Sequence, residues 1–444
     1  MATNRNHLQC TVCGTKTITR VSLTYDPYRE FAFPCPGCAV EIRLGIEVTA
    51  PTEQEVKDWM ERTGLPEELL APNSNYTKLV NANWITHTSE AEWVKEDESI
   101  QNVEILDDTF LIPVPKPRDF SPFIIAGGLM QFEALPLYQQ NNAIRTKATH
   151  ELWPSLEQLI LHYDRKQWNL FDKQVVNIYN VKAPESIANK TKMLYERLEN
   201  YGLLFCKDDT LHTLIKQRLN QAESISNTET SKLVNYYKTR NKDIAIESQL
   251  HNIRRRYTKV FSALAPLYTT HYWDPAKHQL ANFTLAQKRF EELKSLYVDS
   301  FETFCRISVI AAGIEGIIST GRAVIPKSRG EFTIEEFDIF KNGSKPDILR
   351  RLGQPIIDLF VPYMNHRLRN GIGHNAARYD VVGDQVHYVI ENDRGSTSYS
   401  IAYISFCESM FNLYIQLEIV SIYVSWVRLF YKPKDGGKSI FMNA

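Results

Sequence analysis

Short runs of alternating hydrophobic and polar residues dominate the N-terminal part of the chain. The runs TKTITRVSLTY, EFAF and VEIRLGIEV are rich in Val, Thr, Ile and Phe, and Asp26-Pro27 interrupts them. Alternation of this kind, broken by turn residues, is typical of β-hairpins. We therefore expect a β-rich unit over residues 1–45, followed by a helix over 52–70 in which Thr52 caps the N-terminus ahead of Glu53 and Glu55.

Two features mark the next segment as a connecting region. Residues 90–108 contain eight acidic residues and one lysine, and prolines then occupy alternate positions at Pro113, Pro115 and Pro117. Alternate prolines exclude a helix and a central strand. We expect residues 46–125 to form a mixed α/β region that ends in a Pro-rich linker.

Beyond about residue 128 the hydrophobic period changes from two to 3.6, which indicates amphipathic helices. We divide this part into a helical middle domain, residues 126–284, and a C-terminal helical bundle, residues 285–444. Two alternating runs separated by turn residues predict a small β-hairpin at about 379–401. The expected fold class is therefore mainly α, with an N-terminal β-rich unit.

The segment Ser409–Val427 is apolar over 19 residues and carries one formal charge, at Glu418. Its length would allow a membrane span. However, Glu418, Gln416 and Asn412 would then lie in hydrocarbon, and basic residues do not cluster at its flanks. A helix that is apolar all round also suits the centre of a large helical domain, and we favour that interpretation.

Composition narrows the class of protein. The 444 residues include 51 Lys and Arg against 52 Asp and Glu, so no overall field draws the chain to nucleic acid or to a membrane. The seven cysteines are an odd number, and four form two close pairs, which indicates a metal site in a reducing compartment. The N-terminus lacks the apolar stretch of a signal peptide. We expect a soluble cytoplasmic protein with no membrane partner.

The paired cysteines follow a metal-binding pattern. Cys10 and Cys13 form one CxxC, Cys35 and Cys38 form another, and 21 residues separate the pairs. Four thiolates suit tetrahedral Zn²⁺ and leave no open position for catalysis, so we expect a structural zinc ion. Gly14 and Gly37 are expected to supply the unusual backbone angles of the two turns. The segment resembles a zinc ribbon.

A second motif lies in the sequence VPYMNHRLRNGIGHNAARYD, residues 361–380. Arg369, Asn370 and His374 fit the R-N-x-x-x-H motif, and this segment resembles the HEPN superfamily of helical ribonucleases, in particular its Apea-like branch from bacterial defence proteins. The resemblance covers about residues 285–435. Gly371 and Gly373 within the motif each disfavour a helix by about 1 kcal/mol, and Pro362 would kink a helix upstream.

These residue types suit metal-free RNA cleavage. Histidine can take up and return a proton near neutral pH, and arginine is a permanently charged, forked donor for phosphate. On a helix Asn370 and His374 share a face, so Asn370 can orient the imidazole. Arg369 and His374 would lie about 140° apart, so one helix cannot easily bring both to one phosphate.

The family resemblance implies properties that the spacing of the motif residues does not indicate. It implies an active site shared across a homodimer, with His374 as general base, Arg369 stabilising the phosphate, and products that carry a 2′,3′-cyclic phosphate. It also implies a toxin-like anti-phage effector of abortive infection, with RNA, tRNA included, as substrate and a phage-derived trigger as a candidate partner. The alternative is a non-catalytic HEPN module, a regulatory or adaptor protein that dimerises and binds nucleic acid or a protein.

Weaker signals lie elsewhere. Residues 227–259 contain eight basic and three acidic residues with interleaved tyrosines, which would suit single-stranded RNA, although a solvated helix face is the preferred interpretation. Arg254, Arg255 and Arg256 are consecutive and would fan around a helix. Glu302 and Glu315 could supply a further catalytic group or form ion pairs. Walker A, GxGxxG and HExxH motifs are absent from the sequence.

Overall fold

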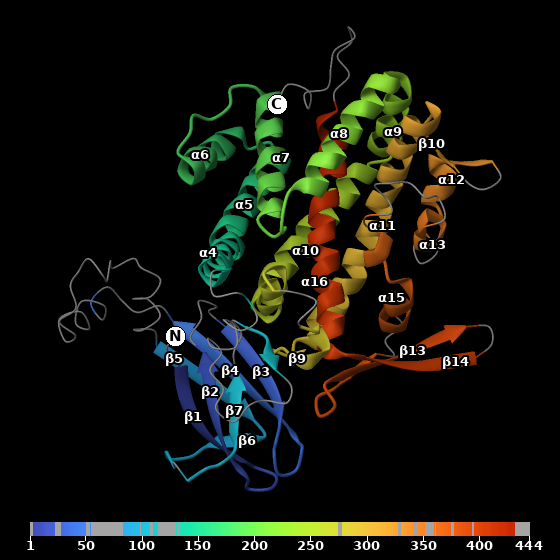
Figure 1. The fold of residues 1–444 in the computed structure, drawn as a ribbon. Helices are drawn as coiled ribbons and strands as arrows, with labels where there is room; N and C mark the ends of the chain where they lie inside the picture. The colour runs from blue at the N-terminus through green and yellow to red at the C-terminus, as the bar shows by residue number, and fades with distance from the viewer. Residues whose placement is uncertain are drawn as a thin grey trace.

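The structure, a computed structural model, consists of a helical body with a β-rich region at one end (Figure 1). It describes residues 3–22, 28–49, 54, 83–97, 99–106, 110–113, 130, 134–273, 278–326, 330–340, 345–350, 359, 361–373, 377–392 and 395–430. The expected helix over 52–70 and most of the expected linker lie outside the described residues.

The N-terminal region is β-rich, as the alternating pattern predicted, and its strands form two small sheets that also include strands from residues 83–106. Its strands are β1 (Thr3–Cys10), β2 (Lys16–Ser22), β3 (Tyr28–Pro34), β4 (Glu41–Thr49), β5 (Asn83–Ser89), β6 (Ala91–Trp93) and β7 (Val103–Leu106). One sheet has the order β6-β1-β2-β7 and the other β3-β4-β5. Ile42, Leu44 and Ile46 alternate along β4 and are all buried, which is the period-two pattern of a strand with one face in a core.

The middle of the chain is helical. Its elements are β8 (Ile112–Pro113), α4 (Ala134–Lys147), a π-helical turn (Ala148–Leu152), α5 (Trp153–Asp164), α6 (Trp168–Tyr179), α7 (Ile187–Leu203), α8 (Thr210–Ile225), α9 (Asn227–Thr239), α10 (Lys242–Leu264), 3-10 turns (Ala265–His271 and Leu280–Asn282) and β9 (Phe283–Thr284). Local capping fixes several boundaries. The side chain of Ser186 accepts a hydrogen bond from the backbone of Asn189 at the start of α7, and Ser226 does the same for Glu229 in α9.

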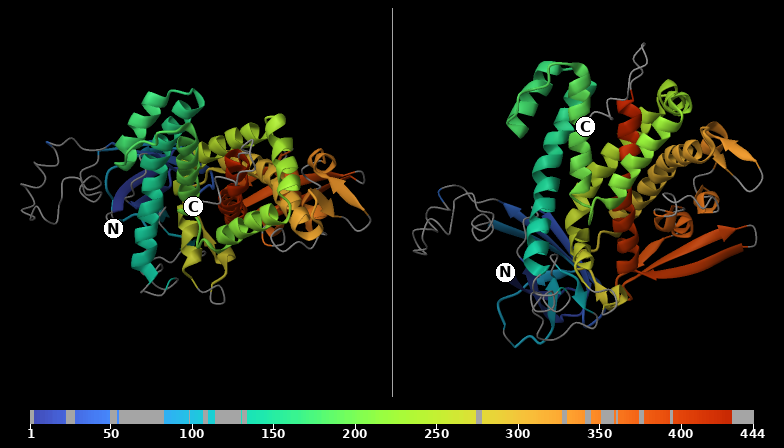
Figure 2. Two further views of the ribbon diagram at one scale, coloured as in Figure 1. Left: turned by 90° about the horizontal axis from the view of Figure 1, so that it is seen from above. Right: turned by 45° about the horizontal axis from the view of Figure 1, so that its top comes forward.

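The C-terminal part combines long helices with a projecting hairpin. Its elements are α11 (Phe290–Thr320), β10 (Val324–Pro326), β11 (Glu331–Thr333), α12 (Ile334–Asp338), α13 (Lys345–Arg350), a 3-10 turn (Val361–Tyr363), α15 (His366–Gly373), β12 (Arg378–Asp380), β13 (Gln385–Asn392), β14 (Gly395–Ala402), α16 (Tyr403–Val420) and α17 (Ile422–Leu429). Strands β13 and β14 form the expected hairpin, which extends away from the helical body (Figure 2). The mainly α class is confirmed.

The apolar helix near the C-terminus is a core helix. Among the described residues, Tyr403–Leu429 is the one helical stretch long and apolar enough to cross a membrane, and 89% of its most apolar window is buried inside the fold. α16 runs through the helical body beside α11 (Figure 1). Its charge at Glu418 is paired with Arg254 of α10, whose Nη2 lies 2.7 Å from Glu418 Oε2. The pairing explains how an otherwise apolar helix keeps a buried carboxylate.

Two hydrophobic clusters hold the described residues together. The larger extends from Phe110 to Phe430 and draws side chains from both 126–284 and 285–444. The smaller lies in the N-terminal sheets and includes Cys10, Cys35 and Ala286. The short pairing of β8 with β9 connects the N-terminal region to the helical body. The four domain boundaries expected from sequence stay predictions.

Candidate metal centre and motif helix

The four paired cysteines converge at one end of the N-terminal sheets. Cys10 ends β1 and Cys13 lies in the turn that follows, while Cys35 and Cys38 occupy the equivalent positions after β3. Cys10 and Cys35 are buried, and Cys13 and Cys38 are exposed. The two hairpins therefore present two thiols each to a shared point.

The sulfur geometry fits a tetrahedral metal ion. All four Sγ atoms lie within 4.8 Å of one another. The distances are 3.8 Å between Cys10 and Cys38 and 3.5 Å between Cys13 and Cys35. Zn–S bonds of about 2.3 Å in a tetrahedron place sulfurs about 3.8 Å apart, whereas a disulfide requires about 2.05 Å. The quartet could hold one metal ion, and zinc is consistent with its donor set.

The two cysteine turns share one backbone arrangement. The N–H of Gly14 donates to the carbonyl of Cys10 at 2.9 Å, and the N–H of Ala39 donates to the carbonyl of Cys35 at the same distance. Gly14 has φ +74° and Ala39 has φ +60°. The left-handed residue therefore follows the second cysteine of each pair.

The expectation that Gly37 supplies an unusual backbone angle is wrong, because Gly37 does not adopt a positive φ. Its small size serves packing instead. A Cβ at this position would lie 2.1 Å from Thr15 Oγ1 and 3.1 Å from the sulfur of Cys13. Gly37 thus allows the second turn to approach the first closely.

The four sulfurs cannot all carry negative charge at this spacing without a cation. Hydrogen bonds from the hydroxyl and backbone of Thr15 lower the pKa of the Cys13 thiol to about 6. A backbone hydrogen bond at Val40 favours the Cys38 thiolate, but burial and the neighbouring sulfurs outweigh it and raise the pKa of Cys38 to about 12. A divalent ion would stabilise all four thiolates together.

Helix α15 carries the Arg–Asn motif. The Oδ1 of Asn365 accepts from the N–H of Leu368 at 3.0 Å, so Asn365 caps the helix at its N-terminus. Leu368 and Ile372 are one turn apart and both buried, which fixes the face that packs on the body. Pro362 lies in the preceding 3-10 turn, so it does not kink α15.

Gly371 is required by a close contact between α15 and the hairpin. A Cβ at this position would lie 2.1 Å from Cδ2 of Tyr388, a residue of β13. The helix-propensity cost of this glycine is therefore offset by packing against an aromatic ring. Gly373 is different, since a Cβ there would meet Val298 at 3.9 Å and Arg369 Cζ at 4.0 Å, which are ordinary contacts.

The Arg369 guanidinium is engaged within the fold. Its Nη2 forms an ion pair with Glu302 of α11, and its Nη1 donates to Asn370 Oδ1 at 3.1 Å. The Arg369 and Glu302 side chains are 25% and 22% exposed. The buried Nε of Arg369 has no hydrogen-bond partner among the described residues. The motif thus presents a fixed, partly accessible cation that retains one unused donor.

The remaining motif residues are placed only in part. Asn370 uses its Oδ1 to accept from Arg369, so this oxygen is turned toward the arginine. His374 lies outside the described residues, and its expected role as general base stays a prediction. The Nδ1 of His366, at the start of α15, lies 3.8 Å from the Oδ1 of Asp347 in α13.

The basic segment 227–259 is not a free patch on the described surface. The three consecutive arginines point in different directions, as expected, and each has an acidic partner: Arg254 pairs with Glu418, Arg255 with Glu157, and Arg256 with Asp299. Arg254 is buried, so for this residue the expected solvated face is wrong.

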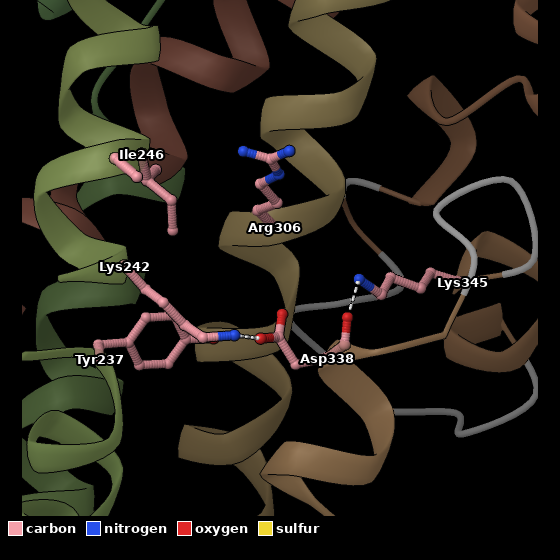
Figure 3. A pocket seen from close by; sticks show the side chains of 7 residues that line it. Tyr237, Lys242, Ile246, Arg306, Asp338 and Lys345 are labelled. Atoms are coloured by element: carbon pink, nitrogen blue, oxygen red, sulfur yellow. Dashed lines mark hydrogen bonds and ion pairs between the residues drawn. The ribbon is translucent and has the colours of Figure 1, made fainter. Parts of the chain in front are cut away.

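The two glutamates of α11 have different surroundings. Glu315 is buried and pairs with Arg218, which is the structural alternative considered from the sequence. Glu302 instead contacts the motif arginine. A further group was not expected from the sequence: Lys242, Arg306 and Lys345 line one cavity together with Asp338 (Figure 3). Neither spacing nor composition signals that convergence.

Comparison with known proteins found no family model, no curated protein and no solved structure that matches the chain.

Proposed function

We propose that this protein is a metal-independent endoribonuclease of the HEPN type whose N-terminal cysteine quartet holds a structural zinc ion. The observation that carries the proposal is the environment of Arg369. Its guanidinium is fixed by Glu302 and Asn370 on a short helix and remains partly accessible, while its one donor without a partner among the described residues, Nε, is buried. A rigid, forked cation of this kind can stabilise the phosphate oxygens in the transition state of RNA cleavage.

The cleavage step balances without a metal. His374 removes the proton from a ribose 2′-hydroxyl, and the 2′-oxygen forms a bond to phosphorus. The bond from phosphorus to the 5′-oxygen of the next nucleotide breaks, and that oxygen takes up a proton from the His374 imidazolium or from water as it leaves. Arg369 stabilises the charge on the non-bridging oxygens. The products are a 2′,3′-cyclic phosphate and a 5′-hydroxyl.

A homodimer is part of the proposal. Helical spacing separates Arg369 and His374 by about 140° if the motif is one continuous helix, so a second copy would complete the site. We infer that the C-terminal helices form the contact, that the dimer acts in the cytoplasm on RNA such as tRNA, and that a phage-derived trigger releases a toxin-like activity. Light scattering at micromolar concentration should find a dimer; a strict monomer would argue against a shared site.

A specific observation favours a second candidate function. The ion pair with Glu302 neutralises Arg369, and partly buried pairs of this kind often serve structure alone. On that basis the chain would be a non-catalytic regulatory or adaptor protein that dimerises through the same helices.

One experiment separates the two functions. The purified full chain is incubated with total RNA or with tRNA, with and without EDTA, and the products are sized and their ends identified. The enzyme should cut in both conditions and leave 2′,3′-cyclic phosphates, because its chemistry needs no metal ion. If the wild-type protein and the His374→Ala variant leave the RNA equally intact, the adaptor function is favoured.

A further inference from the structure

Strand β14 (Gly395–Ala402) forms one edge of the C-terminal three-stranded sheet, whose order is β12-β13-β14. Among the described residues, no strand pairs with its second side. Residues 395–400 are all exposed, and Figures 1 and 2 show the hairpin of β13 and β14 extending away from the helical body. The open edge of β14 is therefore accessible to another molecule.

The register of the hairpin identifies the backbone groups that lie at this open edge. The pairing of Gln385 with Ala402 places Tyr403 opposite Asp384, and the N–H of Tyr403 donates to the carbonyl of Asp384 at 2.9 Å. Since hydrogen-bonded and non-hydrogen-bonded pairs alternate in an antiparallel sheet, the odd-numbered residues of β14 direct their backbone groups to β13. The even-numbered residues between them direct their N–H and C=O groups to the open edge: Ser396, Ser398 and Ser400.

β14 lacks the features by which edge strands of natural proteins avoid pairing with other chains. Such strands are usually short, or they carry charged side chains, a proline or a bulge. β14 is eight residues long, and its sequence GSTSYSIA contains neither a charged residue nor a proline. Its pairing with β13 continues without a bulge from Gly395 to Ala402. The edge is therefore suited to receive a further strand.

The sequence of β14 is compatible with a second copy of itself. If two β14 strands run antiparallel about a twofold axis at Ser398, this residue lies opposite Ser398 of the second copy. Tyr399 then lies opposite Thr397 of the second copy, which is a favourable pair of an aromatic and a β-branched residue, and Ser396 lies opposite Ser400. No like charges meet in this arrangement. A charged strand would find no complementary charge on β14, so an uncharged strand such as β14 itself is the occupant that fits the edge.

We propose that two copies of this chain join through their β14 strands, antiparallel and centred on Ser398, so that the two sheets become one continuous sheet. The outward backbone groups of the two strands would exchange about six hydrogen bonds. A contact of this size is at the small end of protein interfaces, so we expect association at micromolar concentration. The contact uses neither α15 nor the C-terminal helices, and it therefore goes beyond the dimer of the proposed function.

Disulfide cross-linking of the full chain tests the register. The Cα atoms of a hydrogen-bonded antiparallel pair are about 5.5 Å apart, which suits a disulfide. Ser398→Cys should therefore form a covalent dimer under mild oxidation, above the background given by the wild type. Ser400→Cys is the matched control, because it is an exposed serine of the same strand whose copy in the second chain lies four residues along, or about 13 Å. Ser400→Cys should not cross-link alone, but it should cross-link when mixed with Ser396→Cys.

Two substitutions at the same position should weaken the association. Ser398→Pro removes an outward N–H, and Ser398→Lys places two like charges opposite each other. Each should raise the dissociation constant measured by sedimentation velocity by about tenfold or more. The unfolding temperature should change little, because Ser398 is exposed and its backbone groups do not pair with β13. Val382→Lys is the control, since it adds the same charge to an exposed position outside the three strands and should associate like the wild type.

Three outcomes would overturn the proposal. The first is the absence of a cross-linked dimer in Ser398→Cys, and the second is equal cross-linking in Ser398→Cys and Ser400→Cys. The third is an association that neither Ser398→Pro nor Ser398→Lys weakens, which would mean that copies join through another surface. None of these readouts depends on RNA cleavage, so a failure of this contact and a failure of the proposed ribonuclease activity can be distinguished.

Discussion

Glu302 on α11 and Arg369 on α15 form an ion pair between residues that are 67 positions apart in the chain. The pair links the longest described helix to the short helix that carries the Arg–Asn motif. A phosphate that approaches Arg369 must therefore compete with a carboxylate that is already in place. In the proposed enzyme this competition would set the affinity for RNA, whereas proton transfer would depend on His374.

Glu302→Gln should strengthen RNA binding in the proposed enzyme. Glutamine keeps an oxygen that can accept from Arg369, but it removes the negative charge that repels phosphate. We expect KM for RNA to fall by about threefold to tenfold, with a smaller change in kcat. Steady-state cleavage of a labelled oligonucleotide measures both constants, and an unchanged KM would contradict the competition.

Substitutions in the motif test the catalytic assignment. His374→Ala and Arg369→Ala should each lower kcat by about 100-fold or more, because they remove the general base and the phosphate donor. Asn370→Ala should have a smaller effect, since this side chain positions Arg369. The unfolding temperature of His374→Ala should stay near that of the wild type, whereas Arg369→Ala, which removes the ion pair with Glu302, should unfold at a somewhat lower temperature.

His366→Ala is the control for the motif. His366 lies at the start of α15 with its Nδ1 3.8 Å from Asp347 Oδ1, it is not part of the Arg369–Glu302 ion pair, and its loss should leave cleavage nearly unchanged. The opposite pattern, inactive His366→Ala and active His374→Ala, would mean that the histidine has been wrongly assigned.

The cysteine quartet should hold about one zinc ion per chain. Cys35→Ser replaces a buried thiolate ligand by a hydroxyl and should lose the metal and unfold the N-terminal sheets. Cys206→Ala is the matched control, because Cys206 is a buried cysteine of the helical core and should leave the metal content unchanged. Elemental analysis together with circular dichroism gives the readout, and a metal-free protein with intact sheets would contradict the assignment.

The two glycines of α15 should respond in opposite ways. Gly371→Ala forces a Cβ against the ring of Tyr388 and should lower the free energy of unfolding by about 1–3 kcal/mol. Gly373→Ala meets only ordinary contacts and should be neutral or raise that free energy by up to about 1 kcal/mol through helix propensity. Urea unfolding compares the two, and equal effects would show that packing does not distinguish them.

His251 should make the protein less stable as the pH falls. Burial, together with the charges of Arg254, Arg255 and Arg428, lowers the pKa of His251 to about 3. Since the pKa in the unfolded chain is about 6.5, the unfolded state binds a proton that the folded state does not bind until about pH 3. The resulting contribution to the free energy of unfolding is fully present above pH 6.5. It decreases toward pH 3, by at most about 1.4 kcal/mol per pH unit.

The variant His251→Gln isolates that contribution. Its free energy of unfolding should depend less steeply on pH than that of the wild type between pH 6.5 and 4. Urea titrations at half-unit intervals measure the two slopes. Parallel slopes would show that folding does not lower the pKa of His251.

Periodicity predicted the parts of the fold that depend on local pattern. The alternation in VEIRLGIEV correctly predicted a strand, in which Ile42, Leu44 and Ile46 are buried, and the two runs around residue 390 correctly predicted the hairpin. The apolar stretch near the C-terminus was correctly interpreted as a core helix. In each case the burial of one face is decided by residues that are close in sequence.

Contacts between distant segments could not be predicted from local periodicity. The spacing of the cysteines does not indicate that Ala39 rather than Gly37 takes the left-handed position, because this depends on how the two cysteine turns meet. Nor does it indicate that Arg254 is buried against Glu418, or that Arg306 and Lys345 share a cavity. The CxxC pairs were the exception, since their spacing alone specifies which four sulfurs can meet.

The contact between Gly371 and Tyr388 also restricts which residue position 371 can hold. Because the aromatic ring occupies the space that a side chain there would need, α15 can lie this close to β13 only while position 371 carries no side chain. Any larger residue would have to separate the hairpin from the helix that carries Arg369.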